Sequence, residues 1–150
     1  MPVPAMNIET LVARYEKIYA ERMQDLPIVN PGLQVEAAGF REYDGQRLGV
    51  LITPWFMNLL LLPTGDEWKE ETQGNTVDCE FPSGPVEFTV SVDDELGTFL
   101  SAILFRSMTD MPDQETARAI AEEIMKNLFV KVRKDKGISR RALFTNLGTS

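Results

Sequence analysis

Adjacent carboxylates are the residues of this sequence that come nearest to acid–base chemistry. Two acidic runs occur in turn-like contexts, Glu70-Glu71 and Asp93-Asp94-Glu95. Paired carboxylates can serve as general acid and base, but neighbours on an extended strand point to opposite faces and do not converge on one substrate. We therefore interpret both runs as solvated loops with an electrostatic use, and we predict no catalytic residue.

Nucleophilic and metal chemistry has few candidate residues in this composition. Cys79 is the single cysteine and shares a strand face with Val77 and Phe81, where a free thiol usually behaves as a small buried apolar residue. One cysteine excludes an internal disulfide and any paired-cysteine site. The sequence has no histidine, which excludes Ser-His-Asp and Cys-His catalysis and the familiar zinc sites. We predict no metal and no cofactor.

An aromatic segment is the best candidate for a binding surface. It consists of Thr53, Pro54, Trp55, Phe56, Met57 and Asn58, which place two large aromatic rings and a thioether beside a polar amide. Such side chains fill cores routinely. They are also enriched on peptide-binding surfaces, where they can pack around varied apolar segments. The sequence leaves open whether Trp55 is a core residue or a surface anchor.

Charge is distributed unevenly along the chain, whose 150 residues carry a formal net charge of -8. Residues 1–125 hold 22 acidic and 8 basic residues, whereas residues 126–150 hold 1 acidic and 7 basic residues. An acidic body is a poor ligand for nucleic acid, because phosphate neutralisation needs clustered Lys and Arg. We predict one domain over residues 1–130, a basic tail over residues 131–150, and no nucleic-acid partner.

Targeting signals are absent from the pattern of the sequence. Residues 1–6 lack the basic start and the apolar run of a secretory signal. Residues 48–65 carry no charge, but Pro54 and Asn58 interrupt a stretch that falls short of the ~20 apolar residues needed to span a bilayer. Together with the lone cysteine, this predicts a cytoplasmic protein without membrane insertion.

The elements that must position these residues follow from hydrophobic periodicity. Asn7 and Asp113 are suitable N-caps for a first helix ending near Asp25 and a last helix ending near Phe129. Alternation and turn signals predict strands over residues 35–40, 48–52, 55–62, 77–81 and 86–92, whereas residues 96–105 fit a strand or a helix. The predicted fold is α+β, a single domain whose antiparallel or mixed sheet, centred on residues 47–62, is flanked by N- and C-terminal helices.

Several motifs together resemble a known family. They are Leu48-Gly49-Val50-Leu51-Ile52-Thr53-Pro54-Trp55-Phe56-Met57-Asn58-Leu59-Leu60-Leu61-Leu62-Pro63, Trp68, the Phe81-Pro82-Ser83-Gly84 turn with Phe88, Leu96-Gly97 with Phe99, and Ser139-Arg140-Arg141-Ala142-Leu143-Phe144. In this order they resemble the HybE/HupJ family of nickel-iron hydrogenase assembly chaperones. The chain departs from the family pattern at residues 102–108, which lack the cysteine that members often carry, and it lacks the four cysteines of the rubredoxin domain fused to some relatives.

The resemblance implies a cytoplasmic, non-enzymatic chaperone. Such a protein binds the hydrogenase small-subunit precursor with its twin-arginine signal peptide, with the large subunit as a candidate second partner, and delays export until assembly is complete. A protein that binds a twin-arginine signal needs an acidic rim beside an apolar groove. Each charge-assisted hydrogen bond to the arginines is worth about 1.5 to 3 kcal/mol. The expected partner-binding residues are those of the aromatic segment together with Asp93, Asp94, Glu95, Leu96 and Gly97.

The basic tail suggests a further contact. Arg140 and Arg141 lie in a segment that itself resembles the twin-arginine motif, so they could occupy the acidic groove as a self-mimic. The alternative is a solvated basic tail that pairs with the acidic body or with another acidic surface.

Two other functions stay open. One is a small enzyme that uses carboxylates with Lys69 or Tyr43, and the other is a structural subunit of the hydrogenase.

Overall fold

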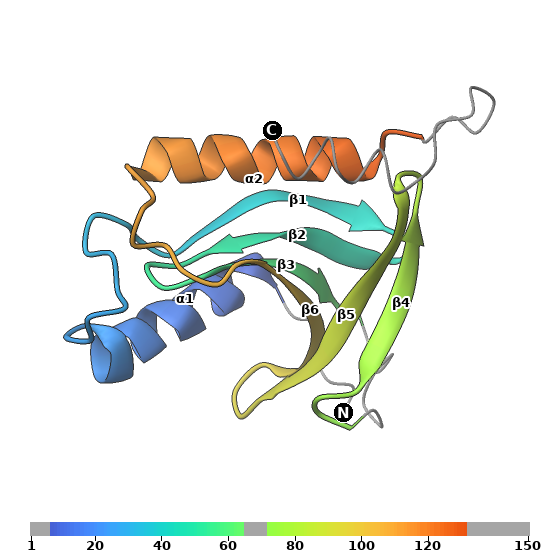
Figure 1. The fold of residues 1–150 in the computed structure, drawn as a ribbon. Helices are drawn as coiled ribbons and strands as arrows, with labels where there is room; N and C mark the ends of the chain where they lie inside the picture. The colour runs from blue at the N-terminus through green and yellow to red at the C-terminus, as the bar shows by residue number, and fades with distance from the viewer. Residues whose placement is uncertain (1–6, 65–71, 132–150) are drawn as a thin grey trace.

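A six-stranded antiparallel sheet forms the body of the protein (Figure 1). The computed structural model describes residues 7–64 and 72–131. The strands are β1 (Glu36–Tyr43), β2 (Gln46–Ile52), β3 (Met57–Leu62), β4 (Thr76–Phe81), β5 (Gly84–Asp93) and β6 (Gly97–Phe105), in the spatial order β1-β2-β3-β6-β5-β4. The predicted α+β fold is confirmed, and the ambiguous stretch over residues 96–105 is the strand β6 beside β3 at the centre of the sheet.

The C-terminal helix α2 (Gln114–Leu128) covers one face of the sheet. As predicted, Asp113 caps it, because the Asp113 carboxylate accepts a hydrogen bond of 2.7 Å from the Thr116 N–H. The helix contacts β1 and β2, and the apolar stripe from Ala117 to Leu128 packs into the larger of two buried clusters. An ion pair between Arg118 and Glu36 joins the first half of α2 to β1.

The two outer strands of the sheet meet at one end, although four strands lie between them in the sheet order. Tyr43 at the end of β1 stacks on Phe81 at the end of β4, with ring centroids 4.9 Å apart. The Tyr43 hydroxyl also donates a hydrogen bond of 2.7 Å to the Glu80 carbonyl. Phe129, just after α2, packs on both rings. The sheet is therefore strongly curled, and α2 lies over its concave side.

The N-terminal helix α1 (Ile8–Ile18) packs on the opposite face. It continues as a π-helical segment, η1 (Tyr19–Met23), in which the Gln24 N–H donates to the Tyr19 carbonyl five residues earlier. The sequence predicted a helix that ends near Asp25, and helical structure does continue to Met23, although its last turn is π-helical. Half-buried Ile18 and Met23 are five residues apart, a spacing that the wider π turn places on one side.

Strand β2 is covered on both faces, which explains its unbroken apolar run. Val50 and Ile52 belong to the cluster beneath α2, whereas Leu51 belongs to the smaller cluster beneath α1. No helix within the described residues is long and apolar enough to cross a membrane.

Candidate partner-binding site

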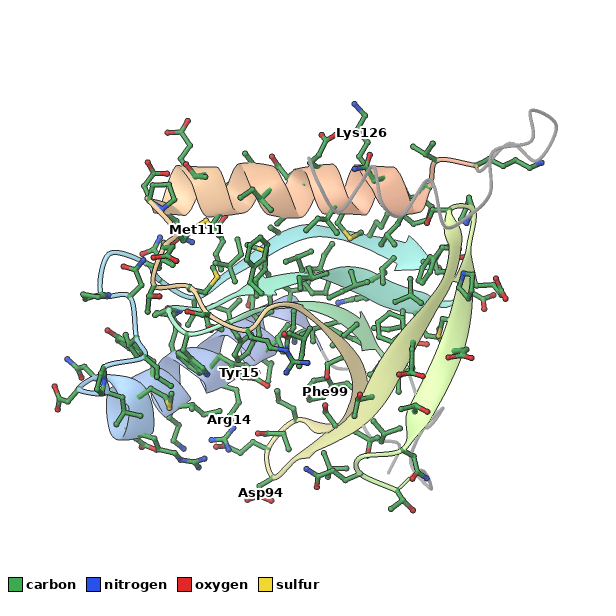
Figure 2. All side chains as sticks on the ribbon, viewed as in Figure 1. Arg14, Tyr15, Asp94, Phe99, Met111 and Lys126 are labelled. Carbon is green, nitrogen blue, oxygen red and sulfur yellow. The ribbon has the colours of Figure 1, made fainter. Side chains whose placement is uncertain are left out.

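Helix α1 lies between the two segments that the sequence singled out. Phe56 of the aromatic segment and Leu96 of the β5–β6 turn both pack against one buried cluster, which also holds Leu11 of α1 and Phe99 of β6. Figure 2 shows Arg14 and Tyr15 on the side of α1 that faces the β5–β6 turn, with Asp94 at the outer end of that turn. Segments about 40 residues apart thus border the same helix.

Four rings make up the aromatic side of this surface, and we call Tyr15, Tyr19, Trp55 and Phe56 the aromatic cluster. Trp55 stacks on Tyr19 with centroids 6.1 Å apart and planes 11° apart. Phe56 meets Tyr15 edge to face at 5.7 Å and Trp55 at 5.4 Å. Trp55 and Phe56 are both half-buried. Trp55 is therefore neither a core residue nor a free surface ring, but part of a partly exposed aromatic layer.

The residues around Trp55 divide into those that shape the loop and those that reach its surface. The Thr53 hydroxyl oxygen accepts hydrogen bonds from the N–H groups of Trp55 and Phe56, at 3.2 and 2.9 Å. The Pro54 carbonyl accepts a hydrogen bond of 2.8 Å from the Asn30 N–H. Thr53, Pro54 and Met57 are buried. They hold the loop in shape, which leaves Trp55, Phe56 and Asn58 as the partly exposed members of the predicted segment.

Two exposed apolar residues belong to the segment that leads into this loop contact. Leu26 and Ile28 follow η1 and are 43% and 54% exposed. The hydrogen bond from Asn30 to Pro54 ties their segment to the aromatic loop. Exposed large apolar side chains in such a segment are candidates for contact with a partner.

Asn58 carries an unusual buried acceptor. Its Oδ1 atom is buried and has no hydrogen-bond partner among the residues that the structure describes. Asn58 lies opposite Ile103 of β6, at a point where the pairing of β3 with β6 shifts register, and Ile103 is 54% exposed. An unsatisfied buried acceptor costs about 1 to 3 kcal/mol of folding free energy. The presence of the Asn58 amide at this position is therefore not explained by a contribution to the stability of the fold.

The acidic side of the surface is built around an ion pair with α1. Asp93 accepts hydrogen bonds of 3.0 and 3.2 Å from Arg14 Nε, and others of 2.9 and 3.0 Å from the N–H groups of Glu95 and Leu96. Arg14 also pairs with Glu95 through Nη1, and Lys17 Nζ lies 3.3 Å from the same carboxylate oxygen. Asp93 therefore both closes the turn and joins it to Arg14 of α1.

The three acids of the turn have different surroundings. The Asp93 side chain is only 14% exposed, and its two oxygens are fully used by Arg14 and the turn. The Glu95 side chain is 50% exposed and carries its ion pairs on one oxygen, Oε2. Asp94 is exposed and forms no ion pair with any residue in the described ranges. Asp94 and the outer part of Glu95 are thus the carboxylates open to a partner.

Charge and burial shift two pKa values at this surface. Burial acts to raise the pKa of Asp93, but the hydrogen bonds from Arg14 and from the backbone of the turn outweigh it and hold that pKa below its ordinary value. Burial first, and then the charge of Asp93, raises the pKa of Tyr15 to about 12. At neutral pH Asp93 is therefore an ionised carboxylate and Tyr15 a neutral phenol.

Sequence reasoning missed the contributions of α1 to the site. The spacing of Tyr15 and Tyr19 indicates only the apolar stripe of a helix, and nothing in the sequence pattern singled out Arg14. Arg14 nevertheless lies between Leu11 and Ile18 on the apolar stripe, and an arginine at such a position signals a buried ion pair. Its partner Asp93 is 79 residues away, a pairing that no local pattern reveals.

The remaining predicted residues have the following positions. Arg140, Arg141 and Lys69 lie outside the described residues, so the tail and one part of the enzyme alternative have no structural counterpart here. The Tyr43 hydroxyl is used in the contact with Glu80. Cys79 is half-buried, and burial, followed by the charges of Asp78 and Asp44, raises the pKa of its thiol. Within residues 7–64 and 72–131, no three potential ligands are grouped so that they could hold a metal ion.

Asp93→Asn is expected to lower the free energy of unfolding by about 2 kcal/mol at pH 7, because the hydrogen bonds to a charged partner are weakened. Since the Asp93 pKa is depressed by folding, its contribution is complete above the ordinary Asp pKa of about 3.9 and is lost as pH falls through the folded-state pKa. The difference between wild type and variant, measured by urea unfolding from pH 7 to 2.5, should shrink toward zero. A constant difference would contradict this assignment, and Asp94→Asn, which breaks no ion pair, is the control.

A partly exposed aromatic layer and outward carboxylates beside one helix are features typical of a surface that binds a protein partner. The sequence model of the family described as "[NiFe]-hydrogenase assembly, chaperone, HybE" matches residues 6–146. The chain belongs to this family of [NiFe]-hydrogenase assembly chaperones, which confirms the resemblance seen in the sequence, and assembly chaperone is a non-enzymatic role.

Individual relatives agree with the family assignment. The chain is 40% identical over 142 residues to the hydrogenase expression/formation protein HupT of Azotobacter chroococcum, covering 93% of this chain and 95% of that protein. It is 37% identical over 133 residues to the hydrogenase expression/formation protein HupJ of Bradyrhizobium diazoefficiens, covering 89% and 78%. It is 40% identical over 124 residues to the "Probable rubredoxin HupJ" of Rhodobacter capsulatus, covering 82% of this chain but only 45% of that longer protein.

A solved structure has the same fold. The solution structure of HybE from Escherichia coli superimposes with a TM-score of 0.69 at 21% identity, covering 92% of this chain and 86% of that one. The six-stranded sheet with its two flanking helices is therefore shared with that protein.

Proposed function

We propose that this chain binds the precursor of the hydrogenase small subunit in the cytoplasm through its twin-arginine signal peptide, and delays export until assembly is complete. One observation supports this proposal above the others. The aromatic cluster and the outward carboxylates of the β5–β6 turn border the same helix, α1, so one short peptide can contact both.

The chemistry of the client matches the two parts of this surface. A twin-arginine segment offers two guanidinium groups followed by apolar side chains. Asp94 and the exposed part of Glu95 can accept hydrogen bonds from guanidinium, and such charge-assisted bonds are the stronger kind. Trp55 offers apolar area for the following residues, and exposed Leu26 and Ile28 lie in the segment that is bonded to the same loop through Asn30.

Arg14 has a positioning role in this proposal. It fixes Asp93, which in turn accepts the N–H groups of Glu95 and Leu96 and so holds the turn that presents Asp94. Because Lys17 and Glu95 are both about half exposed, their pair is weak and exchanges readily with an incoming arginine.

A peptide titration tests the proposal. The probe is a synthetic twin-arginine signal peptide, compared with a peptide in which both arginines are glutamine and with one in which the apolar segment is serine-rich. Calorimetry should show binding of the first peptide and at least about tenfold weaker binding of each altered peptide. Equal binding of all three would show that the surface does not read this signal.

A further inference from the structure

Strand β4 is an outer strand of the sheet; no described strand pairs with its outward side, where only the Glu80 carbonyl, at the end next to the turn, is bonded to Tyr43. Phe81 and Gly84 flank the two-residue turn to β5, so these two residues form a hydrogen-bonded pair. Along an antiparallel ladder, hydrogen-bonded and non-hydrogen-bonded pairs alternate. Pro85, which has no N–H, lies opposite Glu80 at a non-bonded pair, as this alternation requires. The N–H groups of Thr76, Asp78 and Glu80 therefore point away from β5, and no described residue forms a strand against them.

The side chains on this edge are acidic and unbalanced. Asp78 lies directly opposite Glu87 of β5, and Glu80 is on the same face of β4, opposite to the face that packs Val77 and Cys79 on the core. Asp78, Glu80 and Glu87 are all exposed, and none forms a salt bridge with a residue that the structure describes. Like charges at directly opposed positions destabilise a strand pair, so this arrangement favours a cationic neighbour.

The end of α2 brings the remaining chain to this edge. The Ser83 N–H in the β4–β5 turn donates a hydrogen bond of 3.1 Å to the Leu128 carbonyl at the end of α2. The described chain stops three residues later, at Lys131, and 19 residues follow. Their charged residues are Arg133, Lys134, Asp135, Lys136, Arg140 and Arg141, five bases against one acid. An extended chain of this length reaches about 60 Å, whereas six strand residues span about 20 Å.

We propose that the basic C-terminal segment, residues 132–150, docks along the open edge of β4, with its cations against Asp78, Glu80 and Glu87. A covalently attached segment has an effective concentration of the order of millimolar, so weak contacts suffice to hold it. A second copy of the chain is a poor occupant, because it would bring the same three carboxylates together. The docked segment protects an edge that would otherwise be a template for pairing with other chains. This inference is independent of the client and of the site at α1.

Amide hydrogen exchange of the full-length chain tests the inference. In one variant Arg133, Lys134, Lys136, Arg140 and Arg141 are all glutamine, and in another the edge carries Asp78→Asn, Glu80→Gln and Glu87→Gln. In both variants the amides of Thr76, Asp78 and Glu80 should exchange about tenfold faster than in wild type, while those of Val77 and Cys79, which bond to β5, should be unchanged. High salt should reproduce the effect in wild type.

A matched control removes three exposed acids from α2 by Glu115→Gln, Glu122→Gln and Glu123→Gln, and should leave the β4 amides unchanged. Unchanged exchange at Thr76, Asp78 and Glu80 in both test variants would overturn the proposal. Protection that rises with protein concentration would assign the edge to a second copy, and protection seen only with bound client would assign it to the client. Melting temperatures within a few degrees of wild type confirm that each variant is folded.

Discussion

Trp55→Ala is expected to weaken binding of a twin-arginine signal peptide by about thirtyfold or more, because a half-buried tryptophan in a partner surface is a typical hot spot. The same change should cost only about 1 kcal/mol of folding free energy, since the ring is stacked on Tyr19 rather than enclosed. Phe88, which is fully buried, provides the contrast, and Phe88→Ala should cost about 3 to 5 kcal/mol. Peptide titration and urea unfolding of both variants measure the two effects separately.

The acidic part of the site gives a companion measurement. Asp94→Asn should weaken peptide binding by about tenfold with no loss of stability, because Asp94 is exposed and has no ion pair in the described part of the chain. Glu122→Gln removes one exposed charge from α2, away from the site, and should leave affinity unchanged. If Trp55→Ala loses several kcal/mol of stability, or if Glu122→Gln and Asp94→Asn behave alike, the site at α1 is wrongly assigned.

Gly49→Ala is expected to lower the free energy of unfolding by about 3 kcal/mol, the largest stability effect of a single methyl group that we predict. The pairing of β1 with β2 shifts register between Ala38 and Arg41, so Gly39 and Phe40 bulge opposite Gly49. Gly39 has a φ of 66°, which is typical of glycine in such a bulge. The Phe40 ring lies on Gly49, and an added Cβ would lie 2.2 Å from its Cγ atom.

A double-mutant cycle isolates the cause of this effect. Phe40 packs on the cluster beneath α1, so its ring cannot move away without disturbing the docking of that helix. In a Phe40→Ala background the space above Gly49 is empty, and the added cost of Gly49→Ala should fall below about 1 kcal/mol. Urea unfolding of the four proteins gives the coupling. A cost that is the same in both backgrounds would mean that the glycine is required for its backbone and not for the ring.

Local chemistry explains which parts of this fold could be predicted. Asn7 and Asp113 accept hydrogen bonds from the third residue after each of them, and Asp44 and Gly45 adopt the positive φ values of a tight hairpin. Each of these features depends on residues within a few positions, so the sequence contains the whole signal. The strand β6 was ambiguous because its apolar residues do not alternate: Phe99 and Leu100 are buried on opposite faces, and Ile103 is apolar although it is 54% exposed.

The candidate site was only half predictable for a physical reason. The aromatic segment and the acidic turn could be recognised by composition, but the helix that joins them contributes through tertiary contacts such as Arg14 with Asp93 and Tyr19 with Trp55. The continuation of α1 as the π-helical turn η1 likewise has no signature in the residue spacing. The curling of the sheet, which joins Tyr43 to Phe81, likewise has no local signature.

The most direct test of the central claim is affinity capture of the tagged chain from its native cells, with the hydrogenase small subunit made either with or without its twin-arginine signal peptide. We predict that the precursor with the signal is retained, that the form without it is not, and that Trp55→Ala and Asp94→Asn reduce the captured amount. The purified mature hydrogenase should not contain the chain in stoichiometric amount. A structural subunit would be present in that amount. Equal capture of both forms of the small subunit, or of neither, would contradict the account.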